Sequence, residues 1–508
     1  MRSSLLPAAT AVGLCAGLAS ASSKLFHGGT IIAYDSGSES IRVVRDGSLL
    51  VTDDRIAGIF DESPANGTLP SGTERIDVSG QIISPGFVDT HRHGWQTAYK
   101  TIGSNTTLGQ YVGRYGEFAS AAYWTAEDVY NSQLAGLYEA LNAGVTTNLD
   151  HAHHTWSNAT AYAGLNASID SGARVFWAYT IHPLQTVDFS LSEQLANFRD
   201  IAESRIWEDS PTELAVAFDF WSQLDSETIE EIVSTIKAAN VSALTAHSVS
   251  GPFGFVNVPS TVHSYGILNT SLPVVFSHGS FLPAVDAQLL RQTNQFISIT
   301  PESEMHYGHT HEESFYLQDQ AAIGVDTHFT FSTDILTQAR FWLQHVRYRF
   351  FTEVAKRYEE PATSPMSVSQ AFKLATRYGG LALRRPDLGV IEEGAKADLI
   401  VWNARESPAL LGWNDPVAAV MLHASVGDIL HVTVDGEFVK RDGKLTAENY
   451  QAVRQEFLKT AKRIQDIWRD TPYPVAEGPN FAGFEQVPTR QVDIQRGAGT
   501  GYGELFIE

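Results

Sequence analysis

Eight short apolar runs, separated by helix-like segments, constrain the fold of this chain most. Each run has the length of a β-strand. They occupy residues 86–89, 145–149, 175–180, 214–220, 243–246, 274–277, 296–300 and 329–333. Such alternation is typical of an α/β protein, and eight repeats match a (β/α)8 TIM barrel. The periodicity alone leaves a doubly wound sheet open, although neither GxGxxG nor GxxxxGK[ST] is present to favour a nucleotide site.

Two β-rich segments with turn signals bracket these runs, at residues 22–84 and 385–446. We expect them to form one small β-sandwich around a barrel at residues 85–384. In the last segment, 447–508, apolar residues recur at helical spacing and predict an amphipathic helix docked on the body. These residues are Tyr450, Val453, Phe457, Ile464 and Trp468. The remaining Gly- and Pro-rich end is expected to be a loosely attached tail or an oligomer contact.

The first residues have the pattern of a secretory signal peptide. An apolar run from Leu5 to Leu18 precedes Ala19-Ser20-Ala21, which predicts cleavage after residue 21, although a short buried helix is an alternative reading. Sequons compatible with a secreted glycoprotein lie at Asn66, Asn105, Asn158, Asn166, Asn240 and Asn269. The only cysteine, Cys15, would leave with the signal peptide. The mature chain would then offer only histidine and carboxylate groups as metal ligands.

The charge balance narrows the choice of partners. The 508 residues include 35 Lys and Arg against 58 Asp and Glu, a net charge of −23. Such a surface repels phosphate backbones and anionic lipid, so we expect neither nucleic acid nor a membrane as partner. A small-molecule substrate fits better, and the sequence leaves a homo-oligomer open.

A His-X-His pair ends the first apolar run. On a strand, residues two apart face the same side, so His91 and His93 can point at one ion. Three further runs also end in a polar residue, namely His247, His278 and Asp334. If these runs are barrel strands 1, 5, 6 and 8, the five side chains collect at the carboxyl ends of the strands, where such barrels hold their active sites.

With these motifs the chain resembles the amidohydrolase superfamily over residues 24–446, and within it the branch of S-adenosylhomocysteine, guanine and 8-oxoguanine deaminases and triazine chlorohydrolases. Pro301-Glu302-Ser303-Glu304-Met305 looks like that branch's Pro-X-Ser-Asn loop after strand 7. Leu374-Ala375-Thr376 and the segment 389–401 look like its return into the β-sandwich.

The resemblance implies roles for the strand-end residues. His91, His93 and His247 would be metal ligands, Asp334 a ligand that also carries protons, and His278 a catalytic residue that polarises or holds the substrate. No lysine occupies a recognisable bridging position, so we expect one divalent ion, zinc, with Fe2+ as the alternative. Three imidazoles and a carboxylate independently suit zinc, which lowers the pKa of a bound water toward about 7.

Three further residues are candidates for substrate contact. His151 follows the second run among Asp150, His153 and His154, and Trp95 and Gln96 follow the His pair. A hydrogen-bonded loop histidine and a wall-packing aromatic are the alternative interpretations.

One departure from the family bears on the reaction. Deaminases of this branch place a Glu three residues after the strand 5 histidine, where this chain has Ser250, and a hydroxyl cannot replace that acid/base near neutral pH. Deamination of purine-like rings is therefore in doubt. We expect hydrolysis of a carbon–nitrogen bond, other than a peptide bond, in a small substrate, a cyclic one included, through metal-activated water. A metal-dependent lyase or isomerase, and a noncatalytic binding protein, are the alternatives.

Overall fold

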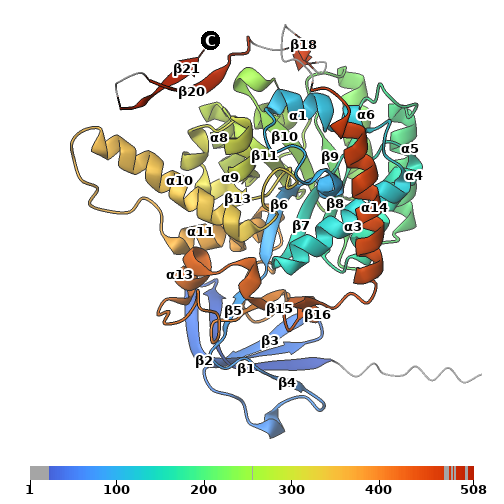
Figure 1. Ribbon diagram of the computed structural model, residues 1–508. Coiled ribbons are helices and arrows are strands. Elements are labelled where there is room, and N and C mark those ends of the chain that lie inside the picture. The colour runs from blue at the N-terminus through green and yellow to red at the C-terminus, as the bar shows by residue number, and fades with distance from the viewer. Residues whose placement is uncertain are drawn as a thin grey trace, which may run out of the picture.

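The computed structural model of the chain describes residues 22–254, 256–473, 480–481, 484–485, 488–497 and 501–507. Figure 1 shows a barrel with a smaller β-sheet body beneath it. The expected signal peptide lies outside the described residues. Within the described part, no helix combines the length and the hydropathy that a membrane span needs.

Eight parallel strands form the barrel, in sequence order from first to last. They are β6 (Phe87–Arg92), β7 (Val145–Ala152), β8 (Arg174–Ile181), β9 (Glu213–Phe218), β10 (Leu244–Val249), β11 (Val274–Ser280), β12 (Phe296–Ile299) and β13 (Ala321–Ile323). The N–H groups of Val325 and Asp326 donate to the His91 carbonyl at 2.9 and 2.8 Å, which joins the end of β13 to β6. This unbroken order and closure confirm the TIM barrel over the doubly wound sheet.

The expected eighth strand is the one wrong element of the barrel. Residues 329–333 form no strand; the last barrel strand is β13, where Ala321–Ile323 pair with Ile297–Ile299 of β12. The apolar character of 329–333 instead serves loop packing, since the Phe329 ring lies 5.4 Å from that of Tyr99. A three-residue strand of small apolar residues was too weak a pattern to compete with Phe329-Thr330-Phe331.

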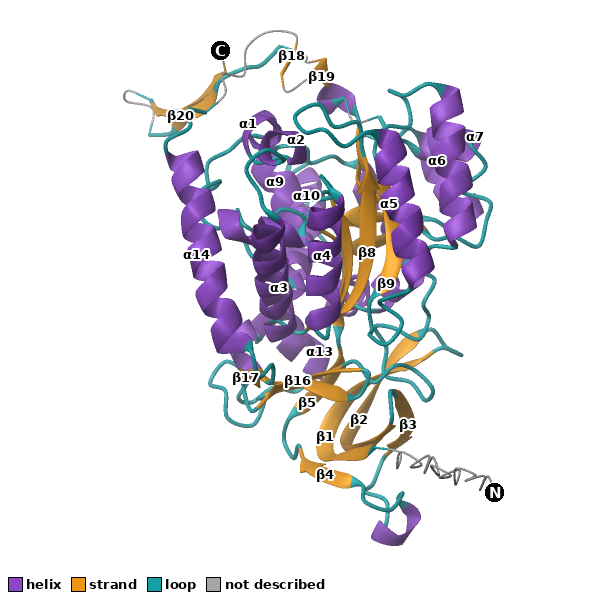
Figure 2. Ribbon diagram, turned by 90° about the vertical axis from the view of Figure 1, so that its right-hand side faces the viewer, coloured by secondary structure: helices purple, strands orange, loops and turns teal. Residues whose placement is uncertain are grey.

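Helices surround the barrel (Figure 2). The longer ones are α3 (Ala126–Asn142), α4 (Asn158–Asp170), α5 (Leu191–Ser204), α6 (Ser226–Ala239), α8 (Ala284–Thr293) and α10 (Ile335–Ala355). Shorter ones are α1 (Leu108–Arg114), α2 (Glu117–Ser120), α7 (Pro259–Ser264), α9 (Pro301–Tyr307), α11 (Val368–Ala375), α12 (Arg377–Ala382) and α13 (Pro416–Ala418). Side-chain caps begin several of them: Thr125 accepts from the N–H of Asp128 at α3, and Ser190 from that of Glu193 at α5.

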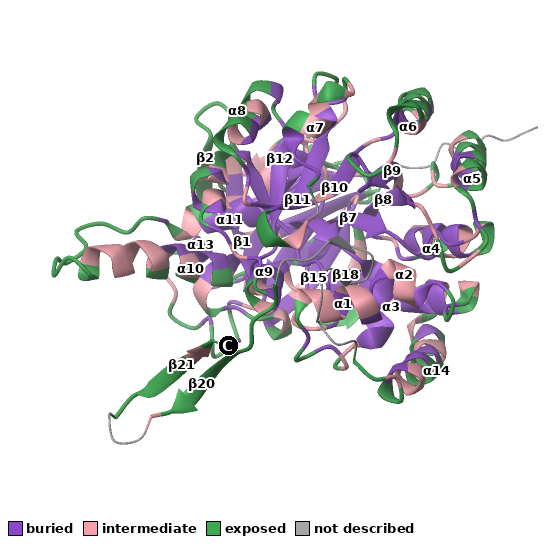
Figure 3. Ribbon diagram, turned by 90° about the horizontal axis from the view of Figure 1, so that it is seen from above, coloured by how far each residue is buried: buried purple, intermediate pink, exposed green. Residues whose placement is uncertain are grey.

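The expected C-terminal amphipathic helix is α14 (Tyr450–Arg469). It lies along α3 in Figure 2 and buries Val453, Ile464 and Trp468. Beyond it, β20 (Val492–Arg496) and β21 (Gly503–Ile507) form an exposed hairpin, shown green in Figure 3, and β18 (Asn480–Phe481) pairs with β19 (Phe484–Glu485).

Strands from both ends of the chain join in one nine-stranded sheet, as expected. The first part supplies β1 (Ser23–Asp35), β2 (Ser40–Thr52), β3 (Arg55–Phe60), β4 (Glu74–Asp77) and β5 (Ile82–Pro85). The later part supplies β14 (Leu399–Trp402), β15 (Ile429–Val434), β16 (Glu437–Arg441) and β17 (Lys444–Leu445). β5 pairs antiparallel with β14 and leads almost directly into β6, the strand that carries His91.

Candidate active site

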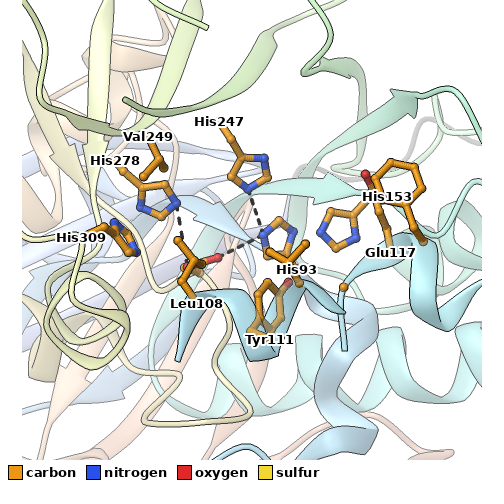
Figure 4. Close-up of a pocket in the computed structure, with 13 residues that line it drawn as sticks. His93, Leu108, Tyr111, Glu117, His153, His247, Val249, His278 and His309 are labelled. Atoms are coloured by element: carbon orange, nitrogen blue, oxygen red, sulfur yellow. Dashed lines mark hydrogen bonds and ion pairs between the residues drawn. The ribbon is translucent and has the colours of Figure 1, made fainter. Parts of the chain in front are cut away.

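Four imidazoles and one carboxylate meet at the carboxyl ends of the barrel strands. His91 lies in β6, His93 just after it, His247 in β10 and His278 in β11, while Asp326 follows β13. Figure 4 shows His93, His247 and His278 turned toward one another at this end of the barrel. The sequence correctly anticipated that the four histidines would come together.

Two of the imidazoles are held in a defined tautomer. Nδ1 of His93 lies 3.0 Å from the carbonyl oxygen of His151, and Nδ1 of His247 lies 2.7 Å from Oδ2 of Asp219. A carbonyl and a carboxylate only accept, so each Nδ1 carries the hydrogen and each neutral ring keeps a lone pair on Nε2. These two Nε2 atoms face each other at 3.3 Å. A contact this short needs a proton or a metal cation between the two nitrogens, and a proton can lie there because the carboxylate of Asp219 outweighs burial and raises the pKa of His247.

The imidazoles of His91 and His278 also have Nδ1 engaged and Nε2 turned toward the centre of the cluster. Nδ1 of His91 contacts Oγ of Ser277 at 2.8 Å, and Nδ1 of His278 contacts Oγ1 of Thr300 at 2.9 Å. Their Nε2 atoms turn to the carboxylate of Asp326, where His91 lies 3.3 Å from Oδ1 and His278 3.9 Å from Oδ2. Nε2 of His93 lies 3.1 Å from Oδ1.

The donor groups of the cluster suit a divalent ion. Burial lowers the pKa of His91 well below its usual range, whereas at His247 the carboxylate of Asp219 outweighs burial and raises the pKa. Nε2 of His91 is buried and makes no hydrogen bond within the described part. Imidazole nitrogens gathered around a carboxylate are the donor set that zinc prefers.

Asp334, the expected carboxylate ligand, is not part of this cluster. It is the N-cap of α10, where Oδ1 accepts from the N–H of Thr337 at 2.6 Å and Oδ2 accepts from its hydroxyl at 2.9 Å. The misplaced eighth strand caused this error, because the ligand position follows the true strand. Asp326 is the carboxylate of the cluster, and the sequence feature that could have predicted it is the short apolar run 321–325 directly before it.

A pocket of about 640 Å³ of empty space, including open solvent at its mouth, lies over the cluster. Apolar and aromatic side chains form much of its wall, with Glu117 at one side (Figure 4). The carboxylate of Glu117 accepts from Nδ1 of His182 at 2.9 Å. The lining consists of His93, Leu108, Tyr111, Val112, Gly116, Glu117, Phe118, His153, His247, Val249, His278, His309 and Asp326. This lining contains no lysine or arginine.

The three expected substrate contacts lie behind the wall instead. His151, Trp95 and Gln96 are fully buried, and none lines the pocket. Nε2 of His151 lies 3.4 Å from Oδ2 of Asp219, and the amide of Gln96 donates to the hydroxyl of Tyr111 at 3.0 Å. His151 lies within β7, which continues through Ala152, whereas Trp95 and Gln96 lie in the short helical turn at Gly94–Tyr99.

His153, which the sequence places beside His151 as a residue able to line the pocket, does line it. It follows the end of β7 and stacks on His93 with ring centroids 4.1 Å apart. The indole N–H of Trp95 donates to its Nδ1 at 2.8 Å. His309 also lines the pocket, with its ring 4.7 Å from that of His278.

Helix α9, which follows β12, contacts the cluster through two side chains. Ser303 donates to Oδ2 of Asp326 at 2.5 Å, and Oε1 of Glu304 lies 3.8 Å from Nδ1 of His278. Glu302 faces the start of α10 and accepts from Gln338 at 2.6 Å. Ser250 does not line the pocket.

The comparisons with known proteins agree with this geometry. The model of the amidohydrolase family matches residues 82–439. A 5-methylthioadenosine/S-adenosylhomocysteine deaminase of Pyrococcus furiosus is 25% identical over 76% of this chain and 89% of its own length. A 5'-deoxyadenosine deaminase of Methanothermobacter thermautotrophicus is 24% identical over 79% and 91%.

Solved structures show the same fold at lower identity. An adenosine deaminase of Xanthomonas campestris with bound zinc superposes with a TM-score of 0.72 at 17% identity, over 88% of this chain and 99% of that one. An atrazine chlorohydrolase of Arthrobacter aurescens complexed with zinc gives a TM-score of 0.72 at 17% identity, over 86% and 100%.

Proposed function

Since the chain belongs to the amidohydrolase family, we propose that it is a metal-dependent hydrolase that cleaves a carbon–nitrogen bond, other than a peptide bond, in a small substrate. The contact of His93 with His247 carries this proposal. Two Nε2 atoms lie 3.3 Å apart beside the carboxylate of Asp326, and because Nδ1 of each ring is already engaged, both Nε2 atoms can bind one cation together.

His91, His93, His247 and Asp326 would hold one divalent ion, and zinc suits these donors best. When bound, such an ion lowers the pKa of a water molecule and polarises the group under attack. Asp219 keeps His247 in the tautomer that ligation requires, and the carbonyl of His151 does the same for His93.

The remaining residues of the site would handle the substrate and its proton. His278 has Nδ1 engaged by Thr300 and offers Nε2 to the pocket side of Asp326, so it can hold or polarise the scissile group. Asp326 takes over the proton-carrying role expected of Asp334. One of its oxygens already accepts from Ser303, which leaves the other to face the imidazoles and to receive a proton from water.

The named relatives act on adenosine derivatives, and deamination is the reaction that their names describe. Our proposal is wider than deamination, because Ser250 stands where the branch has its acid/base Glu. Elemental analysis and a scan of cyclic amides, aminated heterocycles and carbamates test it. Turnover in water labelled with heavy oxygen should place solvent oxygen in the product; a product without it would contradict hydrolysis and favour a lyase or isomerase.

We also propose that the mature protein is secreted and begins near Ser22. The side chains of Asn105, Asn158, Asn166, Asn240 and Asn269 are exposed, which supports glycosylation of at least some sequons. The intact mass of secreted protein before and after deglycosylation tests this. An unshifted mass with Met1 retained would contradict it.

A further inference from the structure

We propose that His153 is a fixed hydrogen-bond donor that selects substrates carrying a neutral acceptor, either a carbonyl oxygen or an aromatic ring nitrogen, close to the scissile bond. The inference rests on the proposed metal-dependent hydrolysis for its chemistry. It adds a residue and a substrate class that the metal ligands do not supply.

The tautomer of His153 follows from its partner. The indole nitrogen of Trp95 can only donate, so Nδ1 of His153, 2.8 Å away, must accept. A neutral imidazole with an unprotonated Nδ1 carries its hydrogen on Nε2. His153 therefore presents an N–H group and not a lone pair.

Trp95 is held rigidly enough to impose this choice. Its side chain is fully buried, and its ring lies edge-on to Trp124 at 4.8 Å and to Trp156 at 5.0 Å. The hydroxyl of Ser132 donates to its carbonyl oxygen at 2.5 Å. A donor fixed on a packed aromatic cluster loses little conformational entropy when a substrate binds.

The position of His153 directs its N–H group at the substrate. The residue lines the pocket and stacks on His93, so the donor borders the metal centre (Figure 4). Among the described residues, none forms a hydrogen bond with its Nε2, whereas Nδ1 accepts from Trp95. A substrate that lacks an acceptor would leave this N–H unpaired in a partly buried site, which costs binding free energy.

The side chains that line the pocket narrow the class of substrate further. Leu108, Tyr111, Phe118 and Val249 give the pocket apolar surfaces, and its lining has no lysine or arginine to balance a carboxylate or phosphate. The lining therefore favours an uncharged substrate with one acceptor beside the bond that is cleaved.

Nitrogen-15 NMR of zinc-loaded protein labelled at histidine tests the tautomer without any turnover. The signals of His153 are those that disappear in His153→Phe. We expect the Nε2–H form in the native protein and a mixture of both tautomers in Trp95→Phe, where the indole donor is lost. An Nδ1–H form in the native protein would overturn the inference.

Binding of three metal-directed probes tests the donor role. Benzohydroxamate, nicotinohydroxamate and isonicotinohydroxamate share a zinc-binding group and differ only in a ring nitrogen. We expect at least one pyridyl probe to bind roughly two- to tenfold more tightly than benzohydroxamate, as one neutral hydrogen bond allows. The gain should vanish in His153→Phe, return in part in His153→Gln, and persist in the control His423→Phe, whose side chain is exposed.

The outcomes separate the two proposals. Binding of all three probes with no difference that depends on His153 would overturn the donor role alone. Failure of all three to bind zinc-loaded protein would overturn the proposed metal centre and with it the substrate class inferred here.

Discussion

Asp219 engages His247 at two points: Oδ1 accepts from the backbone N–H at 2.6 Å and Oδ2 from Nδ1 at 2.7 Å. This carboxylate fixes both the position and the tautomer of a proposed ligand. Asp219→Asn should lower metal affinity by about 10- to 100-fold, the usual effect of losing such a partner. Competition with a chelator measures it, and Asp225→Asn, which alters only the cap of α6, is the control.

Asp326 and Asp334 form a matched pair for the carboxylate assignment. Asp326→Asn should cut turnover by at least about 10²-fold, because it removes a ligand and a proton carrier. Asp334→Asn should stay near native, since Asn caps a helix as well as Asp does. Kinetics and metal content of both variants decide the matter. The reverse ranking would return the ligand role to Asp334.

The histidines should divide into two groups. His91→Ala, His93→Ala and His247→Ala each remove a proposed ligand, so each should lose both the ion and the activity. His278→Ala should keep more of the metal than of the activity, because its Nε2 is the farthest from Asp326 among the contacts measured. Elemental analysis beside rate measurements tests this. Full occupancy in the double variant His91→Ala/His93→Ala would place the site elsewhere.

Purine substrates should be poor for the native enzyme. The branch's acid/base Glu is absent, and general acid/base help is typically worth about 10²- to 10⁴-fold. Release of ammonia from adenosine and guanine measures the activity directly. Rapid deamination of either would mean that another carboxylate, with Glu304 beside His278 as the first to examine, protonates the ring.

Buried histidines should make the protein sensitive to acid. Burial lowers the pKa of His154 to about 3. The unfolded chain, with an ordinary pKa near 6.5, binds this proton at higher pH than the folded chain does. The free energy of unfolding should therefore fall as the pH drops from about 6.5 toward 3, by about 1.4 kcal/mol per pH unit from this residue.

His154→Phe should reduce that slope, whatever its effect on stability at pH 7.5. Denaturant unfolding at pH 7.5 and 5.0 for both proteins gives the two slopes. Equal slopes would show that His154 does not titrate as its burial demands.

The sequence predicted the site correctly where a metal-binding residue type stands at the end of a strong strand pattern. His91, His93, His247 and His278 each follow or end a strong apolar run, and seven of those runs are strands. The order of the strands then brings the four imidazoles together without any further information. The sandwich partners and α14 were also predictable, because strand and helix periodicities persist over whole segments.

The misplaced carboxylate ligand has one physical cause: a loop whose apolar side chains pack against the protein has the local sequence pattern of a strand. Phe329 is apolar because it packs among tyrosines, whereas the real strand, β13, is three residues long and rich in alanine. Placing the eighth strand at 329–333 moved the predicted carboxylate ligand from Asp326 to Asp334. His151 and His153 were both recognised as able to line the pocket, and only the three-dimensional packing shows that His153 does so.

The junction between β5 and β6 has a consequence for any attempt to dissect the molecule. Pro85 of β5 pairs with Leu399, and the N–H of Gly86 donates to the carbonyl of Asp398 at 2.8 Å, directly ahead of the strand that bears His91. A strand from the C-terminal part of the chain, β14, thus holds the segment that leads into β6. A fragment cut after the barrel would leave that segment with an open hydrogen-bonding edge. We therefore expect the barrel to fold correctly only together with the nine-stranded sheet, to which both ends of the chain contribute strands.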